Sequence, residues 1–142
     1  MRVLLDASCL VAAALPQHEH HSVTLADLAR RRAAGQAFMM AAHAVAEAYA
    51  VLTRLPPPHR LGPADALGVL DRNWGRTKTV ALTAAETWRV VRRLAASGIG
   101  GGRVYDGLIA ACAHKARADE ILTWNVAHFE ATRRTRVAAP AK

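Results

Sequence analysis

Short, largely apolar runs alternate with longer segments of helical periodicity along this chain. The runs at 3–5, 37–40, 79–82 and 121–123 are near-continuous rather than alternating, which is typical of strands buried on both faces of a parallel sheet. A fifth strand is expected at 136–138. Because longer helical segments separate the strands, the pattern predicts an α/β fold in which helices cover both faces of a central parallel sheet.

Helices are expected between these strands, and several of their boundaries carry recognisable signals. Pro63 lies in a first helical turn, where its missing N–H costs nothing, and Thr83 with Glu86 three residues later forms a capping box. The helix that starts at 44 has to end before the prolines at 56–58. The expected helices span residues 10–14, 22–34, 44–54, 62–74, 83–97 and 104–116, and a glycine-rich loop occupies 98–102.

Composition is consistent with one folded domain spanning residues 1–142. Hydrophobic residues make up 52% of the chain and charged residues 21%, with a mean hydropathy of +0.06, which excludes a disordered composition. No apolar stretch is long enough to cross a membrane, and the first apolar run meets Asp6 too early for a signal peptide. Cys9 and Cys112 lie among alanine and leucine, as small core residues do. We therefore expect a cytoplasmic protein without a membrane segment.

The excess of basic residues favours a polyanionic partner. The chain has 19 lysine and arginine residues against 11 aspartate and glutamate residues, a formal net charge of +8. Such a charge favours association with nucleic acid or with an acidic protein. Arginines form clusters at 30–32, 89–93 and 133–136. Each cluster is equally compatible with a solvated helix face or tail and with a binding surface.

Four polar side chains occupy positions from which they can meet. Asp6 follows the first strand and Asn125 follows the fourth, so both would line one crevice if those strands are neighbours. Glu47 lies at the edge of the apolar face of its helix, and Asp106 follows the glycine loop in an apolar segment. Taken singly, Asp6 and Asp106 could also be helix caps. Asn125 could equally belong to a plain turn, and Glu47 could be an exposed helical residue.

A cluster of carboxylates at the edge of a core indicates a bound cation. The charges repel one another and lose hydration there, so they persist when a cation or a basic partner neutralises them. Carboxylate oxygens suit Mg²⁺ or Mn²⁺, and such an ion can activate water and stabilise the charge that develops on a phosphodiester during hydrolysis. The hypothesis from these residues is therefore a metal-assisted hydrolase.

The order and setting of these residues resemble the PIN domain, in particular the VapC-type toxin ribonucleases of bacterial toxin–antitoxin pairs. The resemblance covers nearly the whole chain and is carried by the segments VLLDASCLVAAAL, AEAYAVLTRL, VYDGLIAACA and ILTWNVAHFE. It implies a Mg²⁺-dependent endoribonuclease whose parallel sheet has the strand order 3-2-1-4-5. It also implies an RNA substrate, a cognate antitoxin protein as partner, and a homodimer.

The same resemblance implies a role for each site residue. Asp6 and Asp106 would be the principal metal ligands. Glu47 would hold either a water molecule on the ion or a second ion. Ser8 and Thr123 would support the site by orienting the carboxylates through hydrogen bonds.

Asn125 is the point at which this sequence departs from the family pattern, because many relatives carry aspartate there. It remains among the expected catalytic residues, since an amide oxygen can still ligate a metal. The amide brings no charge, so we expect one ion, Mg²⁺ or its substitute Mn²⁺, rather than two. Arg103 is expected to contact a phosphate, and Trp124 is expected to lie near the bound RNA.

Two alternative functions remain open. A catalytically weak or inactive PIN-like module that binds RNA or protein is favoured by Asn125 and by the net charge of +8. A phosphatase of the haloacid dehalogenase type would also carry an aspartate nucleophile after its first strand, but its second aspartate is replaced here by Ser8. The histidines at 18, 20 and 21 are expected to form a solvated turn rather than a metal site.

Overall fold

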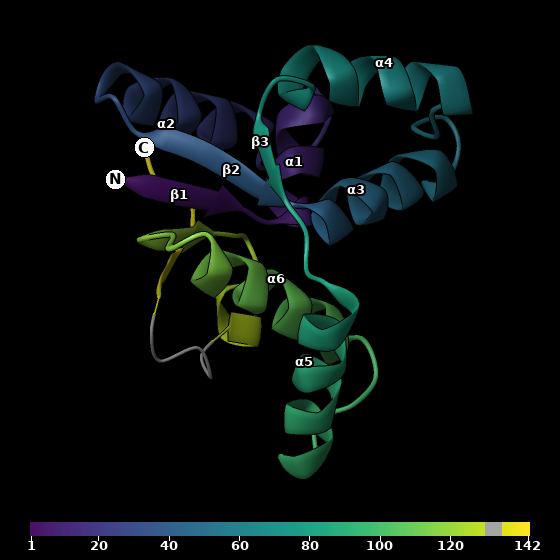
Figure 1. Ribbon diagram of the computed structural model, residues 1–142. Helices are drawn as coiled ribbons and strands as arrows, with labels where there is room; N and C mark the ends of the chain where they lie inside the picture. The colour runs from purple at the N-terminus through teal and green to yellow at the C-terminus, as the bar shows by residue number, and fades with distance from the viewer. Residues whose placement is uncertain (130–134) are drawn as a thin grey trace.

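The computed structural model describes residues 1–129 and 135–142, and a five-stranded sheet lies at its centre (Figure 1). The strands lie in the order β3-β2-β1-β4-β5, and each pairing between neighbours is parallel. Their bounds are β1 (Arg2–Leu5), β2 (Ala37–Ala41), β3 (Lys78–Val80), β4 (Glu120–Leu122) and β5 (Arg136–Ala138). The predicted α/β class and the strand order 3-2-1-4-5 are therefore confirmed.

Helices cover the sheet in two layers (Figure 1). The first four helices pack against one another on one side, whereas α5, α6 and the short 3₁₀ helix η1 lie on the other. The bounds are α1 (Ala7–Ala14), α2 (His21–Ala33), α3 (Ala42–Arg54), α4 (Pro63–Trp74), α5 (Ala84–Ala96), α6 (Arg103–Lys115) and η1 (Val126–Phe129). The alternation of strands and helices thus produces the three layers that the sequence predicts.

The central position of β1, between β2 and β4, explains its continuous apolar run. The side chains of Val3, Leu4 and Leu5 are fully buried, and each contributes roughly 1.5–3 kcal/mol by leaving water. Because β1 and β4 are parallel neighbours, Asp6 and Thr123, which follow them, emerge at the same edge of the sheet.

The apolar face of α3 is narrow and places one acidic residue beside it. Ala44, Ala48 and Leu52 recur at successive turns and are fully buried. Glu47 lies next to this stripe, and 37% of its side chain is exposed. The prediction that Glu47 lies at the edge of the buried face is confirmed.

Some boundaries differ from those predicted, for identifiable reasons. α1 begins at Ala7 rather than at residue 10, because Asp6 already has the extended backbone of an N-cap residue. β3 ends at Val80, two residues earlier than expected, and the chain then enters the predicted capping box of Thr83 and Glu86, which is present. The sequence analysis assigned no helix to 126–129, where the structure has η1.

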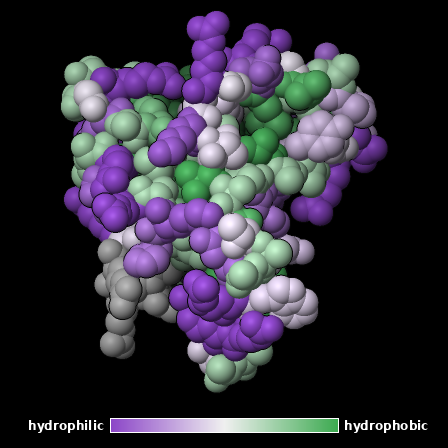
Figure 2. Space-filling model, viewed as in Figure 1, coloured by the Kyte–Doolittle hydropathy of each residue, from purple (hydrophilic) through white to green (hydrophobic). Residues whose placement is uncertain are grey.

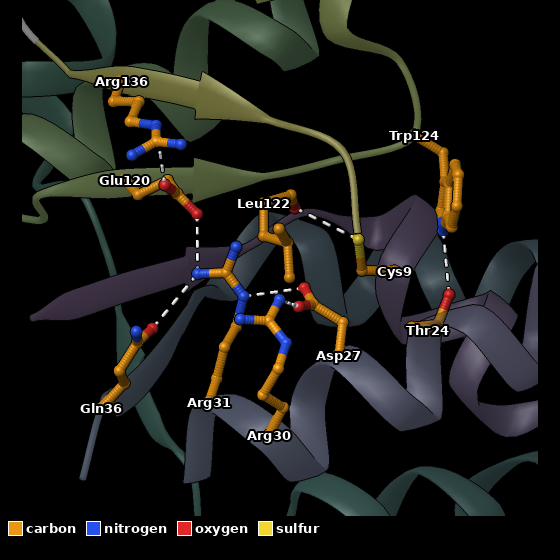
Figure 3. A network of polar contacts seen from close by, with 10 residues as sticks. All are labelled: Cys9, Thr24, Asp27, Arg30, Arg31, Gln36, Glu120, Leu122, Trp124 and Arg136. Carbon is orange, nitrogen blue, oxygen red and sulfur yellow. Dashed lines mark hydrogen bonds and ion pairs between the residues drawn. The ribbon is translucent and has the colours of Figure 1, made fainter. Parts of the chain in front are cut away.

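A buried ionic network joins α2 to β4 and β5 (Figure 3). Glu120 is 1% exposed and pairs with Arg31 (Nη1–Oε1, 2.8 Å) and with Arg136 (Nε–Oε2, 3.1 Å). Arg31 also pairs with buried Asp27 (Nε–Oδ2, 2.7 Å). Arg31 therefore belongs to the interior, so the arginine cluster at 30–32 is neither a uniform solvated face nor a uniform binding surface. Arg133 and Arg134 of the third cluster lie outside the described residues.

Both cysteines are free and buried, as the apolar sequence around them predicts. The thiol of Cys9 donates a hydrogen bond to the carbonyl oxygen of Leu122 (3.3 Å), and burial raises its pKa. Among the helices of the described chain, none has the length and apolar character needed to cross a membrane.

Candidate active site

Asp6 lies at the carboxyl end of β1 and occupies the N-cap position of α1, yet its side chain makes no capping hydrogen bond. The residue is 4% exposed, and its Oδ2 accepts hydrogen bonds from Ser8 Oγ (2.8 Å) and Thr123 Oγ1 (2.7 Å). Its backbone N–H donates to the carbonyl oxygen of Leu122, across the β1–β4 pair. A simple capping role therefore does not account for Asp6.

The two hydroxyl groups that contact Asp6 are themselves held by the backbone of the next segment. The N–H of Trp124 donates to Ser8 Oγ (3.0 Å), and the N–H of Asn125 donates to Thr123 Oγ1 (3.0 Å). Each hydroxyl thus accepts one hydrogen bond and has its own proton to give to Asp6 Oδ2. Within the described residues nothing donates a hydrogen bond to Asp6 Oδ1, so this oxygen remains free to bind a ligand.

Glu47 and Asp106 bring two further carboxylates to this edge of the sheet, from α3 and α6. Burial raises the pKa of both, and the negative charge of Asp6 raises each pKa further. Asp106 also raises the pKa of Glu47, whereas the nearby guanidinium of Arg54 lowers it. Asp6 therefore acts electrostatically on both Glu47 and Asp106 at this edge of the sheet.

An aromatic stack connects the helices that carry Glu47 and Asp106. The rings of His43 and Tyr105 lie 4.6 Å apart at an angle of 15°. His43 precedes Glu47 by one turn of α3 and approaches its Oε2 at 3.8 Å, and Tyr105 directly precedes Asp106. Burial lowers the pKa of His43, which favours its neutral form. The sequence analysis missed this pair, although the spacing of His43 and Glu47 places both on one helix face.

His128 of η1 is a second neighbour that the sequence analysis missed. Its Nδ1 lies 3.5 Å from Asp106 Oδ2. The imidazole lowers the pKa of Asp106, which burial raises. The exposed Arg103, the first residue of α6, lowers the same pKa. Because α6 begins at Arg103 with Gly102 as its N-cap, Asp106 is not a helix cap. Two basic groups thus lie beside Asp106.

Asn125 and Trp124 follow β4 but lie at the periphery of this cluster. Asn125 is exposed and joins the cluster through its backbone N–H to Thr123, in a position compatible with an ordinary turn. Trp124 stacks on His20, with ring centroids 3.8 Å apart, and donates from Nε1 to Thr24 Oγ1 (3.0 Å; Figure 3). The turn that contains His20 is thus held by the indole of Trp124.

Carboxylate oxygens are the donors that this site can offer to a metal. In the described part of the chain, no three His, Cys, Asp or Glu side chains are already gathered as a ready-made ion site. Mg²⁺ needs only one or two direct carboxylates and keeps water as its remaining ligands. A cation would also favour the charged forms of Glu47 and Asp106, whose pKa values are raised by burial and by the negative charge of Asp6. The residues present therefore fit a hard divalent ion.

Comparison with known proteins identifies the family of this fold and site. The sequence model of the PIN domain matches residues 3–133. This chain belongs to the PIN domain family. The PIN domain is 35% identical over 132 residues to "Ribonuclease VapC40" of Mycobacterium tuberculosis (strain ATCC 25618 / H37Rv), covering 93% of this chain and 92% of that protein. It is 36% identical over 115 residues to "Ribonuclease VapC27" of the same strain, covering 81% and 79%.

A solved structure supports the same fold over nearly the whole chain. The PIN domain superposes on a chain of VapBC2 from Rickettsia felis, a complex bound to a DNA fragment from its promoter, with a TM-score of 0.72. The identity is 18%, and the match covers 98% of each chain. At this identity the likeness shows the fold alone, whereas the two ribonucleases identify this PIN domain as one of the VapC type.

Proposed function

We propose that this PIN domain is a metal-dependent endoribonuclease that hydrolyses RNA phosphodiester bonds and acts as the toxin of a toxin–antitoxin pair. The observation that carries this proposal is that Asp6, 4% exposed at the carboxyl end of β1, has its Oδ2 held by two hydroxyl groups and its Oδ1 without a hydrogen-bond donor among the described residues. RNA as the substrate is supported by the relatives of at least 35% identity, which are named ribonucleases. Carboxylates that repel one another at a strand end suit cation-assisted hydrolysis of a phosphodiester.

Asp6, through Oδ1, and Asp106 would hold Mg²⁺, or Mn²⁺ in its place, and Glu47 would complete the acidic side of the site. When bound, the ion supplies Lewis-acid chemistry that makes water more acidic and stabilises charge on the phosphate. Asn125 adds no charge and is exposed, which favours one ion rather than two.

The other side chains position the reacting groups. Ser8 and Thr123 fix the orientation of Asp6 through two hydrogen bonds to one oxygen. Glu47, whose raised pKa makes its carboxylate a better proton acceptor, takes a proton from the attacking water. Arg103 binds a phosphate beside Asp106, whose pKa is lowered by the positive charge of Arg103. Trp124 lies at the rim of the site, where a neighbouring nucleotide could contact it.

The partner that we propose is a cognate antitoxin. We also propose that the two proteins meet in the cytoplasm. The solved relatives include toxin–antitoxin complexes of the VapBC type, among them that of Rickettsia felis. A negatively charged antitoxin segment would complement a chain of net charge +8. Self-association into a homodimer stays a prediction, which the mass of the purified chain in solution will test.

A second candidate, an RNA- or protein-binding module without cleavage, is favoured by one observation. The resemblance to the VapC-type ribonucleases implies an aspartate at the position of Asn125, and the amide leaves the acidic side of the site with less charge. Binding of RNA that is strong, unaffected by EDTA and never followed by cleavage would support this alternative.

Cleavage of RNA by the purified chain, with Mg²⁺ or with EDTA, tests the main proposal. We expect cleavage only with the ion, and a loss of roughly 100-fold or more for Asp6→Asn and for Asp106→Asn, the scale of losing a catalytic group. Asp65→Asn is the matched control, because Asp65 is an exposed acid on α4. Equal cleavage by all four proteins, or cleavage in EDTA, would refute the proposal.

A further inference from the structure

A groove of about 660 Å³ runs between α5 and α6 and reaches the candidate active site. We call it the α5–α6 groove. Val90 and Leu94 of α5 and Ala110 of α6 supply its apolar lining, and Asp106 and His128 also line it. The groove therefore shares Asp106 with the carboxylate cluster, so a chain lying in it passes directly beside the proposed site of cleavage.

The two helices that line the α5–α6 groove approach each other closely at Gly107. A Cβ atom built on Gly107 would lie 2.8 Å from Leu94 Cδ1, closer than side chains tolerate. Glycine is unfavourable within a helix, so its presence in the middle of α6 has a packing reason here. The two helices thus meet at Gly107 and Leu94, both of which line the groove.

The charged side chains that line the groove are mostly basic. Arg89, Arg93 and Arg103 are exposed and line the groove, and none of them forms a salt bridge with another described residue. Lys115 is different, because it pairs with Glu86 at 2.7 Å. Three guanidinium groups are therefore available to an anion, in the same groove that has an apolar lining.

The spacing of these arginines suits a chain of regularly placed anions. Arg89 and Arg93 are four residues apart on α5, which puts their Cβ atoms about 5–6 Å apart on one helix face. Arg92 does not line the groove, and its guanidinium lies 5.5 Å from the centre of the Trp88 ring. In Figure 2, the lower part of the molecule, where Figure 1 places α5 and α6, shows hydrophilic side chains interspersed with apolar ones.

We propose that the α5–α6 groove binds the single-stranded RNA that flanks the bond to be cleaved. Arg89, Arg93 and Arg103 contact its phosphates, and its bases lie against the apolar lining. This inference rests on the proposed function, because it assigns a path to the substrate of that site. An acidic peptide has the same charge, but RNA alone must also place a phosphate beside Asp106, which the groove already lines.

The test measures binding separately from cleavage, with the full chain in EDTA and a short fluorescein-labelled single-stranded RNA of randomised sequence. The double variant Arg89→Ala/Arg93→Ala is compared with Arg76→Ala/Arg92→Ala, which removes the same charge from exposed residues outside the groove. We expect the groove variant to bind about 10-fold more weakly and to lose about 0.7 in salt-dependence slope for each phosphate contact removed. The control should stay within about twofold of the parent chain.

The outcomes separate this proposal from the proposed function. If the parent cleaves RNA but the groove variant binds it as the control does, the groove assignment is wrong and the nuclease stands. If the parent neither binds nor cleaves RNA, both fail. If the groove variant loses binding of poly-L-glutamate but keeps binding of RNA, the occupant is an acidic peptide and the RNA proposal is overturned. Unchanged thermal melting of both variants confirms that each is folded.

Discussion

At the scale of single residues, the site depends on how two hydroxyl groups hold one carboxylate. Ser8 and Thr123 both donate to Asp6 Oδ2, and backbone N–H groups of the segment after β4 fix each hydroxyl in turn. An aspartate that is 4% exposed needs such partners to remain charged. Asp6 is therefore oriented by residues from both sides of the β1–β4 pair.

Removing either hydroxyl should slow catalysis without unfolding the protein. We expect Ser8→Ala or Thr123→Val to lower the rate of RNA cleavage about 10–100-fold, the range found when a metal ligand loses its supporting contact. The free energy of unfolding should fall by only about 1–3 kcal/mol, because one hydrogen bond to a buried charge is lost. Ser97→Ala, at the exposed C-cap of α5, is the control. Cleavage rates equal to that of the control would contradict this role.

The raised pKa of Glu47 predicts a specific dependence of stability on pH in the metal-free protein. Its carboxyl group binds a proton more readily when folded than when unfolded, so folding is favoured while it is protonated. Stability should fall as the pH rises from the ordinary value of 4.5 through the raised pKa, and Glu47→Gln should remove the part of that fall that Glu47 contributes, while the raised pKa of Asp106 still contributes its own part. Thermal melting of the parent and of Glu47→Gln at several pH values from 4.5 upward measures this change in stability. If the Glu47→Gln protein melts with the same pH dependence as the parent, the assignment is refuted.

At the scale of elements, the alternation of apolar runs and helices was enough to predict the architecture. Four near-continuous apolar runs indicated parallel strands, and the capping box of Thr83 and Glu86 fixed the start of α5. The sequence also indicated the strand end that carries Asp6 and the helix edge that carries Glu47. The contacts of His43 with Tyr105 could not be predicted in the same way, because they depend on how α3 and α6 are placed in space.

The stack between α3 and α6 should matter more for activity than for stability. Tyr105→Leu removes a ring contact worth about 0.5–1.5 kcal/mol but leaves a residue that is largely exposed. We expect cleavage to fall roughly 10-fold, because Glu47 and Asp106 lose a contact that fixes their separation. Tyr49→Leu, on α3 and also exposed, is the matched control. Equal cleavage by the two variants would show that the stack has no positioning role.

At the scale of the whole molecule, the least predictable feature was a buried pairing between distant segments. Arg31 was grouped by sequence with Arg30 and Arg32 as part of a basic cluster, yet it pairs with Glu120 and Asp27 in the interior. The spacing of Asp27 and Arg31 on one helix is visible in the sequence, but the burial of Arg31 is not, because its partner Glu120 is far away along the chain. The PIN domain thus combines an architecture that is readable from sequence with a network that only tertiary structure reveals.

The same network makes neighbouring arginines differ sharply in their effect on stability. Arg31→Met should lower the free energy of unfolding by about 3–5 kcal/mol, since it leaves buried Glu120 and Asp27 without a shared partner. Arg32→Met should change it by less than about 1 kcal/mol, since Arg32 is exposed. Urea unfolding of both variants measures the difference. Equal losses would show that the network contributes no more than a surface arginine.

The central claim is that Asp6 and Asp106, supported by Glu47, hold a divalent ion. Titration of the full chain with Mn²⁺, followed by electron paramagnetic resonance, tests it directly and does not require a known RNA target. We expect one ion to bind per chain. Asp6→Asn and Asp106→Asn should abolish this binding, and Asp65→Asn should retain it. If the parent chain binds no Mn²⁺, or if all four proteins bind it equally, Asp6 and Asp106 do not hold the ion.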